Sequence, residues 1–311
     1  MEKRSIGSLS VSVVGLGCNN FGTRLDQART SRVVDAALDA GINFFDTADV
    51  YGGTKSEELL GRALGDRRGS VIIATKFGIP LDEARPGGAR PEYIRRAVED
   101  SLQRLGTHYI DLYQLHRPDP QVPIADTLGA LGELVIQGKV REIGSSNFSV
   151  DQLREADTAA PAGAARFVSV QNEYSLLRRD PEAGVLRECV DRGLGFLPYF
   201  PLASGVLSGK YANAAAPPEG TRLSLGSPLS ARFLSDQNVA VAGALASFAR
   251  EHGHSLLELA FSWLSAQPAV ASVIAGATSP EQALANARAI NWSLTDEELE
   301  QIDRLAPRAR T

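Results

Sequence analysis

The sequence predicts a (β/α)8 barrel (TIM barrel), and three observations favour this fold class. Short apolar segments, many of them β-branched, alternate with segments of helical periodicity along most of the chain. The alternation yields eight strand–helix units at even spacing, the number that such a barrel requires. A doubly wound sheet shares the alternation, but the count favours the barrel. At 311 residues the chain also has the length of one barrel, so we expect a single domain over residues 1–311.

The strands are expected where a short segment is apolar on both faces, as in a parallel sheet covered by helices. These segments are residues 11–16, 44–46, 71–75, 110–115, 140–145, 167–171, 195–199 and 272–275. Apolar residues recur at helical spacing in the intervening segments. We therefore expect helices at residues 27–40, 56–65, 91–105, 124–137, 150–158, 181–192, 239–266 and 279–290.

Three segments lie outside this alternation. Residues 4–10 can pair as an N-terminal hairpin before the first strand. An extra C-terminal helix is expected at residues 295–305, because Thr295 and Glu298 have the spacing of a capping box. Residues 200–237 are rich in Gly, Ala, Pro and Ser and show no sustained period. A loop of this length in a compact domain is usually either functional or disordered.

Composition argues against several functional classes. The formal net charge of −5 gives no electrostatic reason to bind nucleic acid. No apolar run approaches the roughly 20 residues of a membrane span, and the N-terminus lacks the apolar core of a signal peptide. The two cysteines, Cys18 and Cys189, have no metal-site spacing and suggest a reducing compartment. We therefore expect a cytoplasmic protein, and a monomer by default.

In a barrel the active site lies at the C-terminal ends of the strands, and polar residues occupy several of these positions. Asp46, Lys76 and His116 end three successive predicted strands, and Tyr51 follows Asp46 by five residues. A tyrosine with a pKa of about 10 is a weak acid–base group near neutrality, and an adjacent ammonium lowers that pKa. A carboxylate would hold the lysine, and a neutral histidine could orient a carbonyl oxygen. This set suits protonation of an oxygen during hydride transfer, without a metal.

Seven segments, in order along the chain, resemble the aldo-keto reductases. They are FFDTADVYGG, ATKFG, LYQLHRPD, IGSSNFS, VQNEYSLL, YFPLASGVLSGKY and AGATSPEQALAN. The resemblance implies a (β/α)8 barrel that binds NADP(H) in extended form, without a Rossmann motif, and reduces small aldehydes and ketones. Gly276 and Gln282, where many members place cations near the 2′-phosphate, resemble the branch of prokaryotic aldo-keto reductases and potassium-channel β subunits. NADPH is therefore expected over NADH, which stays possible.

The resemblance also implies roles for individual residues. Asp46, Tyr51, Lys76 and His116 match the catalytic tetrad, with Tyr51 as the general acid. Asp49, between the first two, is expected to be an ordinary loop residue. The substrate would contact Tyr51, His116, Asn20 and Phe77. The cofactor would contact Cys18, Asn19, Asp46, Ser146, Asn147, Gln171, Tyr199, Phe200, Pro201, Leu202, Ser204, Lys210, Gly276, Thr278, Gln282 and Asn286.

Three alternatives remain open at this point. The segment GLGCNNFG suggests a Rossmann dehydrogenase, but Asn20 stands where the third glycine of that motif belongs. A second alternative is an NADP(H)-binding partner protein like the channel β subunits, which commonly have asparagine at the position of His116. The third is a barrel aldolase or isomerase that forms a Schiff base at Lys76. The complete tetrad favours the reductase.

Overall fold

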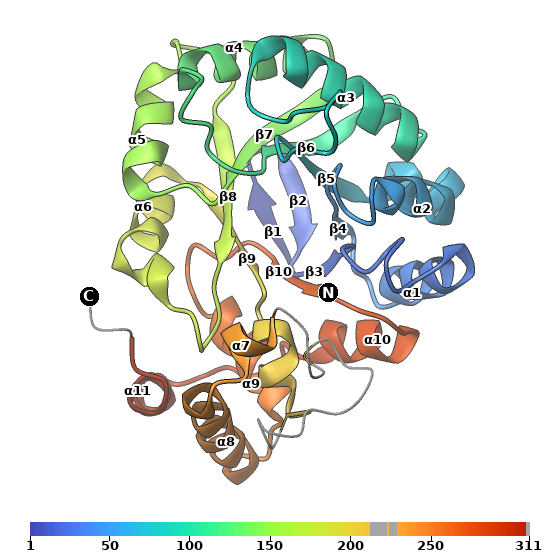
Figure 1. Ribbon diagram of the computed structural model, residues 1–311. Helices are drawn as coiled ribbons and strands as arrows, with labels where there is room; N and C mark the ends of the chain where they lie inside the picture. Colours follow the sequence, from blue (N-terminus) through green and yellow to red (C-terminus); the bar gives the residue numbers. More distant parts are fainter. Residues whose placement is uncertain (212–222, 224–228, 309–311) are drawn as a thin grey trace.

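The computed structural model describes residues 1–211, 223 and 229–308, and it confirms the predicted barrel. Eight parallel strands form one sheet in the order β10-β3-β4-β5-β6-β7-β8-β9 (Figure 1). Backbone hydrogen bonds close the ring next to β9, because Phe196 donates to Ala269 O at 2.7 Å and accepts from Ala271 N at 2.9 Å. The strands are β3 (Val14–Gly17), β4 (Phe44–Asp46), β5 (Ile72–Phe77), β6 (Ile110–Leu115), β7 (Val140–Ser146), β8 (Phe167–Glu173), β9 (Gly195–Tyr199) and β10 (Val273–Gly276).

Helices surround the ring of strands and bury their apolar faces against it (Figure 1). Several begin at side-chain caps, such as Ser149 before α5 and Ser279 before α10. The surrounding helices are α1 (Gln27–Asp39), α2 (Lys55–Leu64), α3 (Pro91–Leu105), α4 (Ile124–Ile136), α5 (Val150–Ala159), α6 (Val185–Arg192), α9 (Leu256–Ser265) and α10 (Pro280–Arg288). Among the described residues no helix is long and apolar enough to span a membrane.

An N-terminal hairpin closes the bottom of the barrel. Strands β1 (Lys3–Ile6) and β2 (Leu9–Ser12) pair antiparallel, and Ile6, Leu9 and Val11 pack with apolar side chains of the barrel interior. The hairpin includes Val11 and Ser12, so the prediction of a single strand over residues 11–16 was wrong. The chain turns at this point because the Ser12 side chain donates to Val14 O at 2.7 Å and its N–H donates to Asn43 Oδ1 at 2.6 Å.

The predicted helix at residues 239–266 is also two helices, α8 (Asp236–Glu251) and α9. Gly253 has a φ of +79°, which glycine adopts without strain and which ends the first helix. Ser255 and Glu258 then form a capping box that starts the second. The C-terminal helix α11 (Asp296–Leu305) confirms the prediction, with the expected capping box of Thr295 and Glu298.

The aperiodic segment at residues 200–237 lies partly outside the described residues. Its described parts contain the short helices η3 (Ala203–Ser208) and α7 (Ser230–Phe233). Two further 3-10 turns lie elsewhere in the chain, η1 (Gly65–Ser70) and η2 (Asp180–Ala183).

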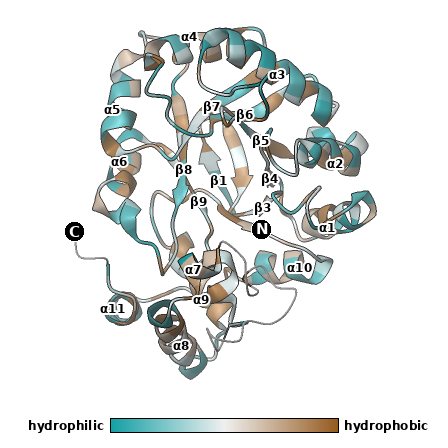
Figure 2. Cartoon of the chain, viewed as in Figure 1, coloured by the Kyte–Doolittle hydropathy of each residue, from teal (hydrophilic) through white to brown (hydrophobic). Residues whose placement is uncertain are grey.

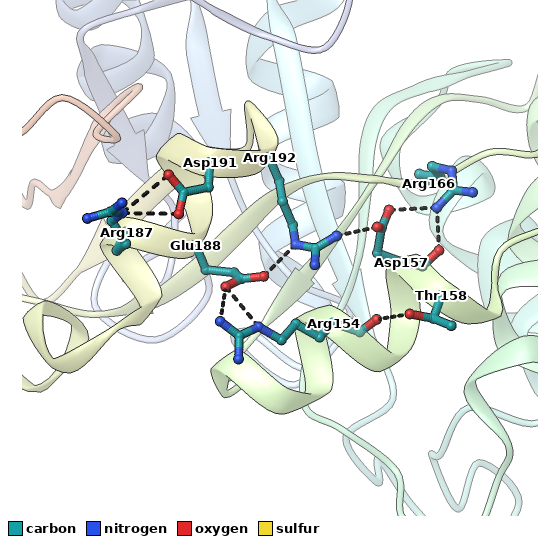
Figure 3. A network of polar contacts seen from close by, with 8 residues as sticks. All are labelled: Arg154, Asp157, Thr158, Arg166, Arg187, Glu188, Asp191 and Arg192. Carbon is teal, nitrogen blue, oxygen red and sulfur yellow. Dashed lines mark hydrogen bonds and ion pairs between the residues drawn. The ribbon is translucent and has the colours of Figure 1, made fainter.

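Ion pairs connect neighbouring helices at the outer surface, and those between α5 and α6 are an example (Figure 3). Glu188 accepts hydrogen bonds from Arg154 and Arg192, and Arg192 also reaches Asp157. Such exposed pairs contribute little to stability because water and salt screen them. They orient α5 relative to α6, and the buried apolar core supplies the main stabilisation.

Candidate active site

A cavity of about 720 Å³ opens at the C-terminal ends of the strands. In Figure 2 strand β8 changes from brown at its start to teal at its end, which is the polar side of the barrel. The cavity wall contains most of the residues predicted to form the site. They are Asn19, Asn20, Asp46, Tyr51, His116, Ser146, Asn147, Gln171, Tyr199, Phe200, Pro201, Leu202, Ser204, Lys210, Gly276, Thr278, Gln282 and Asn286.

Lys76 lies behind the cavity wall and joins Asp46 to Tyr51. Its side chain is completely buried, and its ammonium donates to Asp46 Oδ2 at 2.7 Å and to Thr47 O at 2.8 Å. The same ammonium lies 3.4 Å from the Tyr51 hydroxyl. The other carboxylate oxygen of Asp46 accepts from Gln171 Nε2 at 2.8 Å. Asp46 is therefore held from two sides, and it holds the lysine against the phenol.

Burial and charge act in opposite directions on this group. Burial by itself lowers the pKa of Lys76, but the Asp46 carboxylate and Tyr51 raise it above its usual value. Burial raises the pKa of Tyr51, while the Lys76 ammonium opposes that rise. As predicted from the sequence, Lys76 acts to lower the pKa of Tyr51, but burial has the larger effect and the pKa is raised overall. In this state Tyr51 is a protonated phenol with a cation beside it, which is the form that can donate a proton.

His116 stands on the other side of Tyr51 as a neutral imidazole. Its ring centroid lies 5.9 Å from that of Tyr51, at an interplanar angle of 79°. Burial, with the Lys76 and Arg117 cations, lowers the pKa of His116 to about 2. Its Nδ1 is buried without a hydrogen-bond partner among the described residues. This buried nitrogen is therefore unsatisfied, and the residue itself contributes to the cavity wall.

Amide and hydroxyl groups line the wall next to Gln171. Asn147 has a φ of +62°, a left-handed conformation that asparagine tolerates better than most residues. Its side chain donates to His116 O at 3.0 Å and accepts from the Tyr199 hydroxyl at 2.8 Å. Ser146 Oγ donates to Gln171 O at 2.8 Å. This network fixes the amide groups and the Tyr199 ring before any ligand binds.

The segment after β9 has an unusual backbone. Phe200, Ala203 and Ser204 have φ values of +51°, +45° and +57°, and Gly205 follows at +104°. Left-handed residues in such turns can form concave anion-binding sites from backbone N–H groups. Ser204 Oγ is buried without a hydrogen-bond partner in the described structure, and the Lys210 side chain lines the same cavity. These features fit a phosphate-bearing ligand.

The far end of the cavity is formed by the turn from β10 into α10. Gln282 Oε1 accepts from the N–H of Thr278 at 2.9 Å and from its hydroxyl at 3.0 Å. Asn286 lies one turn further along α10 and also lines the cavity. At Gly276 a Cβ atom would lie 3.1 Å from the Asn20 side chain, so the absence of a side chain keeps this end open.

Two predicted ligand contacts need correction. The side chains of Cys18 and Phe77 are fully buried and do not line the cavity. Successive residues of a strand point to opposite faces, so Phe77 must face the helices if Lys76 points inward. There it stacks on Tyr113 with ring centroids 4.7 Å apart. Cys18 packs in the outer apolar core, and burial raises the pKa of its thiol.

The structure also reveals cavity residues that the sequence reasoning missed. Arg24, Arg117, Arg232, Val50, Ile79 and Tyr211 all contribute to the wall. The position of Arg117, directly after His116, was a usable signal. Arg232 comes from α7, which no periodicity predicted. Among the described residues no group of three or more His, Cys, Asp or Glu side chains could hold a metal ion.

Comparisons with known proteins agree with this architecture. The sequence model of the Aldo/keto reductase family matches residues 13–307. The chain is 34% identical to a probable voltage-gated potassium channel subunit beta of Oryza sativa subsp. japonica, over 97% of this chain and 96% of that protein. A glycerol dehydrogenase of Gluconobacter oxydans superposes with a TM-score of 0.83 at 32% identity, covering 97% of this chain and 94% of that chain. An aldo-keto reductase of Bacillus halodurans gives 0.82 at 35% identity, covering 99% and 97%. The chain therefore belongs to the aldo/keto reductase family of oxidoreductases.

Proposed function

We propose that the protein reduces aldehydes and ketones to alcohols with NADPH, and that Tyr51 is the proton donor. The observation that carries this proposal is the buried chain of contacts from Asp46 through Lys76 to the Tyr51 hydroxyl, which reaches the wall of a large cavity. A nicotinamide cofactor, when bound, would supply the hydride. Carbonyl reduction also requires a proton donor and a group that orients the carbonyl. Side chains of this protein can supply both.

Different groups of cavity residues would bind successive parts of an extended cofactor. Ser146, Asn147 and Gln171 would bind a carboxamide, and the Tyr199 ring would stack on the nicotinamide. Ser204 and Lys210 fit the pyrophosphate, for the reasons of geometry given above. Gln282 and Asn286, with Gly276 and Thr278, would hold the adenosine end. NADPH is preferred in this proposal, and NADH is the alternative that the test must include.

The roles of the catalytic side chains follow from their protonation. The neutral His116 ring would donate a hydrogen bond to the carbonyl oxygen and orient it. Tyr51 would then give its proton to that oxygen as negative charge develops there. The ammonium of Lys76 stabilises the resulting phenolate, because a positive charge next to the phenol favours its ionised form. Asp46 keeps the ammonium in place throughout.

A screen of NADPH oxidation across aldehydes and ketones, with NADH in parallel, tests this function. We expect oxidation of NADPH that depends on the carbonyl compound, with slower oxidation of NADH. The relative named as a channel subunit suggests the competing function, a cofactor-binding partner protein. Tight NADPH binding, measured by fluorescence, with no oxidation by any carbonyl in the panel would favour that function instead.

The sequence-based expectations on location and assembly stay predictions. Both cysteines are free and buried, and neither is paired in a disulfide. Sedimentation velocity of the purified protein would test the expected monomer, and cell fractionation would test the cytoplasmic location.

A further inference from the structure

The charges around the cavity are strongly biased towards cations, although the whole chain has a formal net charge of −5. The described wall contains four cationic side chains, Arg24, Arg117, Lys210 and Arg232, and a single carboxylate, Asp46. Asp46 is already paired with Lys76. The cavity therefore favours anionic ligands, and the cofactor phosphates proposed above account for only part of that charge.

Arg117 differs from the other three cations in its position, while it shares with Arg24 and Lys210 the lack of a side-chain ion pair to any described residue. Lys210 belongs to the segment that fits phosphate, and Arg232 forms an ion pair with Glu173. Arg117 follows His116 directly, at the catalytic end of the cavity. Its guanidinium has no hydrogen bond or ion pair with any residue that the structure describes, and the residue is exposed. Its positive charge contributes to the lowered pKa of His116 and opposes the rise in the pKa of Tyr199.

The lining around Arg117 limits the shape of what it could bind. Val50 and Ile79 line the cavity and offer apolar contacts. A guanidinium presents several N–H groups in a planar fork, and this geometry matches the oxygens of a carboxylate or a phosphate. The carbonyl must reach His116 and Tyr51, and Arg117 is adjacent to His116 in the chain. Because Arg117, His116 and Tyr51 line the same cavity, one molecule can present an anionic group to Arg117 and a carbonyl to the other two residues.

We propose that the substrate is a short carbonyl compound with an anionic group, a carboxylate or a phosphate, and that Arg117 binds this group. The proposal rests on the carbonyl reduction proposed above and adds its substrate class. Arg117 then determines specificity, while Tyr51 and His116 carry out the chemistry.

Two matched pairs of substrates test the proposal by steady-state kinetics. Succinic semialdehyde is compared with butanal, and glyceraldehyde 3-phosphate with glyceraldehyde. We expect the wild-type protein to prefer the anionic member of at least one pair in kcat/KM, and the pair that shows the preference identifies carboxylate or phosphate. In Arg117→Gln the ratio of kcat/KM between anionic and neutral members should fall by about tenfold or more, as expected for loss of a charge-assisted contact.

A matched variant controls for the change in net charge. Arg62 on α2 is exposed and lies outside this cavity, and its only ion pair within the described part of the chain is a long one of 3.9 Å to Glu58. Arg62→Gln removes the same charge and should keep the wild-type ratio. The proposal would be overturned if Arg117→Gln lowered kcat/KM equally for the anionic and the neutral member of each pair. It would also be overturned if Arg62→Gln lowered the anionic-to-neutral ratio as much as Arg117→Gln does.

A binding measurement separates failure of this proposal from failure of the proposed function. Succinate and inorganic phosphate are titrated calorimetrically into protein saturated with NADP+, so that the cofactor fills its own phosphate sites. We expect binding of at least one anion to the wild type and its loss in Arg117→Gln. Carbonyl reduction without any Arg117-dependent anion binding would contradict the substrate class alone. Arg117-dependent binding without reduction of any carbonyl would support the anion site and contradict the reductase function.

Discussion

Asp46 ends β4 and Asp49 lies three residues later in the following loop, and both are buried, with 3% and 1% of their surface exposed. Asp46 accepts hydrogen bonds from Lys76 and from Gln171. Both carboxylate oxygens of Asp49 lack a hydrogen-bond partner among the described residues, although its backbone N–H donates to Lys76 O at 3.0 Å. The two acids are thus equally buried and differently partnered.

Arg104, a cation close enough to act on Asp49, is already paired with another carboxylate. Arg104 donates to Glu57 Oε2 at 2.7 Å, and Glu57 also accepts from Thr75. Burial and the neighbouring Glu57 carboxylate raise the pKa of Asp49 to about 7, against the opposing effect of Arg104 and Lys76. The charged and titratable groups Arg85, Tyr93, Arg96 and Asp100 line the small space beside it.

The comparison shows that the partner, and not the depth of burial, decides what a buried acid can do. A buried charge is tolerated when an opposite charge and hydrogen bonds compensate for lost hydration. Asp46 has this compensation and can therefore hold Lys76 next to Tyr51. Asp49 lacks it, so near neutral pH much of its population is a neutral carboxylic acid that packs behind the loop of Tyr51.

Lys76→Met removes the partner of Asp46, and among these substitutions it should have the largest effect on stability. Asp46 would become a buried acid without its cation, and removal of one partner from such a pair costs about 3–5 kcal/mol of stability. Turnover should fall by about 10²-fold or more, because Tyr51 loses the charge that stabilises its phenolate. Urea unfolding and carbonyl-dependent NADPH oxidation measure the two effects.

Lys139→Met is the matched control, since Lys139 pairs with Glu99 at the surface. It should change both quantities only slightly. A Lys76→Met protein as stable and active as this control would show that the buried pair does not organise the site.

Asp49→Asn tests the acid without a partner and should change how stability depends on pH. The pKa of Asp49 is about 7 in the folded protein and about 4 when unfolded, so the folded state holds the extra proton between these values. Stability is therefore lost as pH rises from about 4 to about 7, by up to about 4 kcal/mol. The Asn variant lacks this loss and should be more stable than the wild type at pH 8, with little difference at pH 4.5.

Urea unfolding at these two pH values measures the effect, and Asp66→Asn in the exposed η1 turn serves as the control. An Asp49→Asn difference that is the same at both pH values would mean that the carboxyl does not titrate as the structure indicates.

His116→Ala should have a smaller effect, confined to the chemistry. Removing one oriented hydrogen-bond donor to the reacting oxygen costs about 10²-fold in turnover, and the barrel should stay folded. Because the pKa of His116 is lowered to about 2, the imidazole stays neutral from pH 5 to pH 8. The wild-type rate should show no transition from this residue in that range. A transition near pH 6.5 that disappears in His116→Ala would contradict the neutral state.

Much of the fold and of the candidate site was predictable because strand ends are visible in the sequence. Asp46, Lys76 and His116 each follow an apolar run, and a parallel barrel brings such ends together. The break at Gly253 and Ser255 also had a signal, a glycine before a capping box, which the longer helical period obscured. The hairpin boundary at Ser12 depended on hydrogen bonds to Asn43, which is distant in sequence.

The state of Asp49 could not be read from the chain in the same way. The sequence predicted an ordinary loop residue, and the structure buries it instead. Asp49 is buried beside residues of α3, and it has no cationic partner within the described structure because Arg104 is paired with Glu57. The side-chain directions of Cys18 and Phe77 likewise required the exact register of each strand end, where an error of one residue reverses the face.

The most direct test of the account is Tyr51→Phe, measured for NADPH affinity and for carbonyl-dependent NADPH oxidation in the same preparation. The substitution removes the hydroxyl that Lys76 reaches at 3.4 Å and keeps the ring beside His116. We predict that turnover becomes undetectable, while the dissociation constant for NADPH changes less than about threefold. Turnover close to that of the wild type would contradict the assignment of Tyr51 as the proton donor.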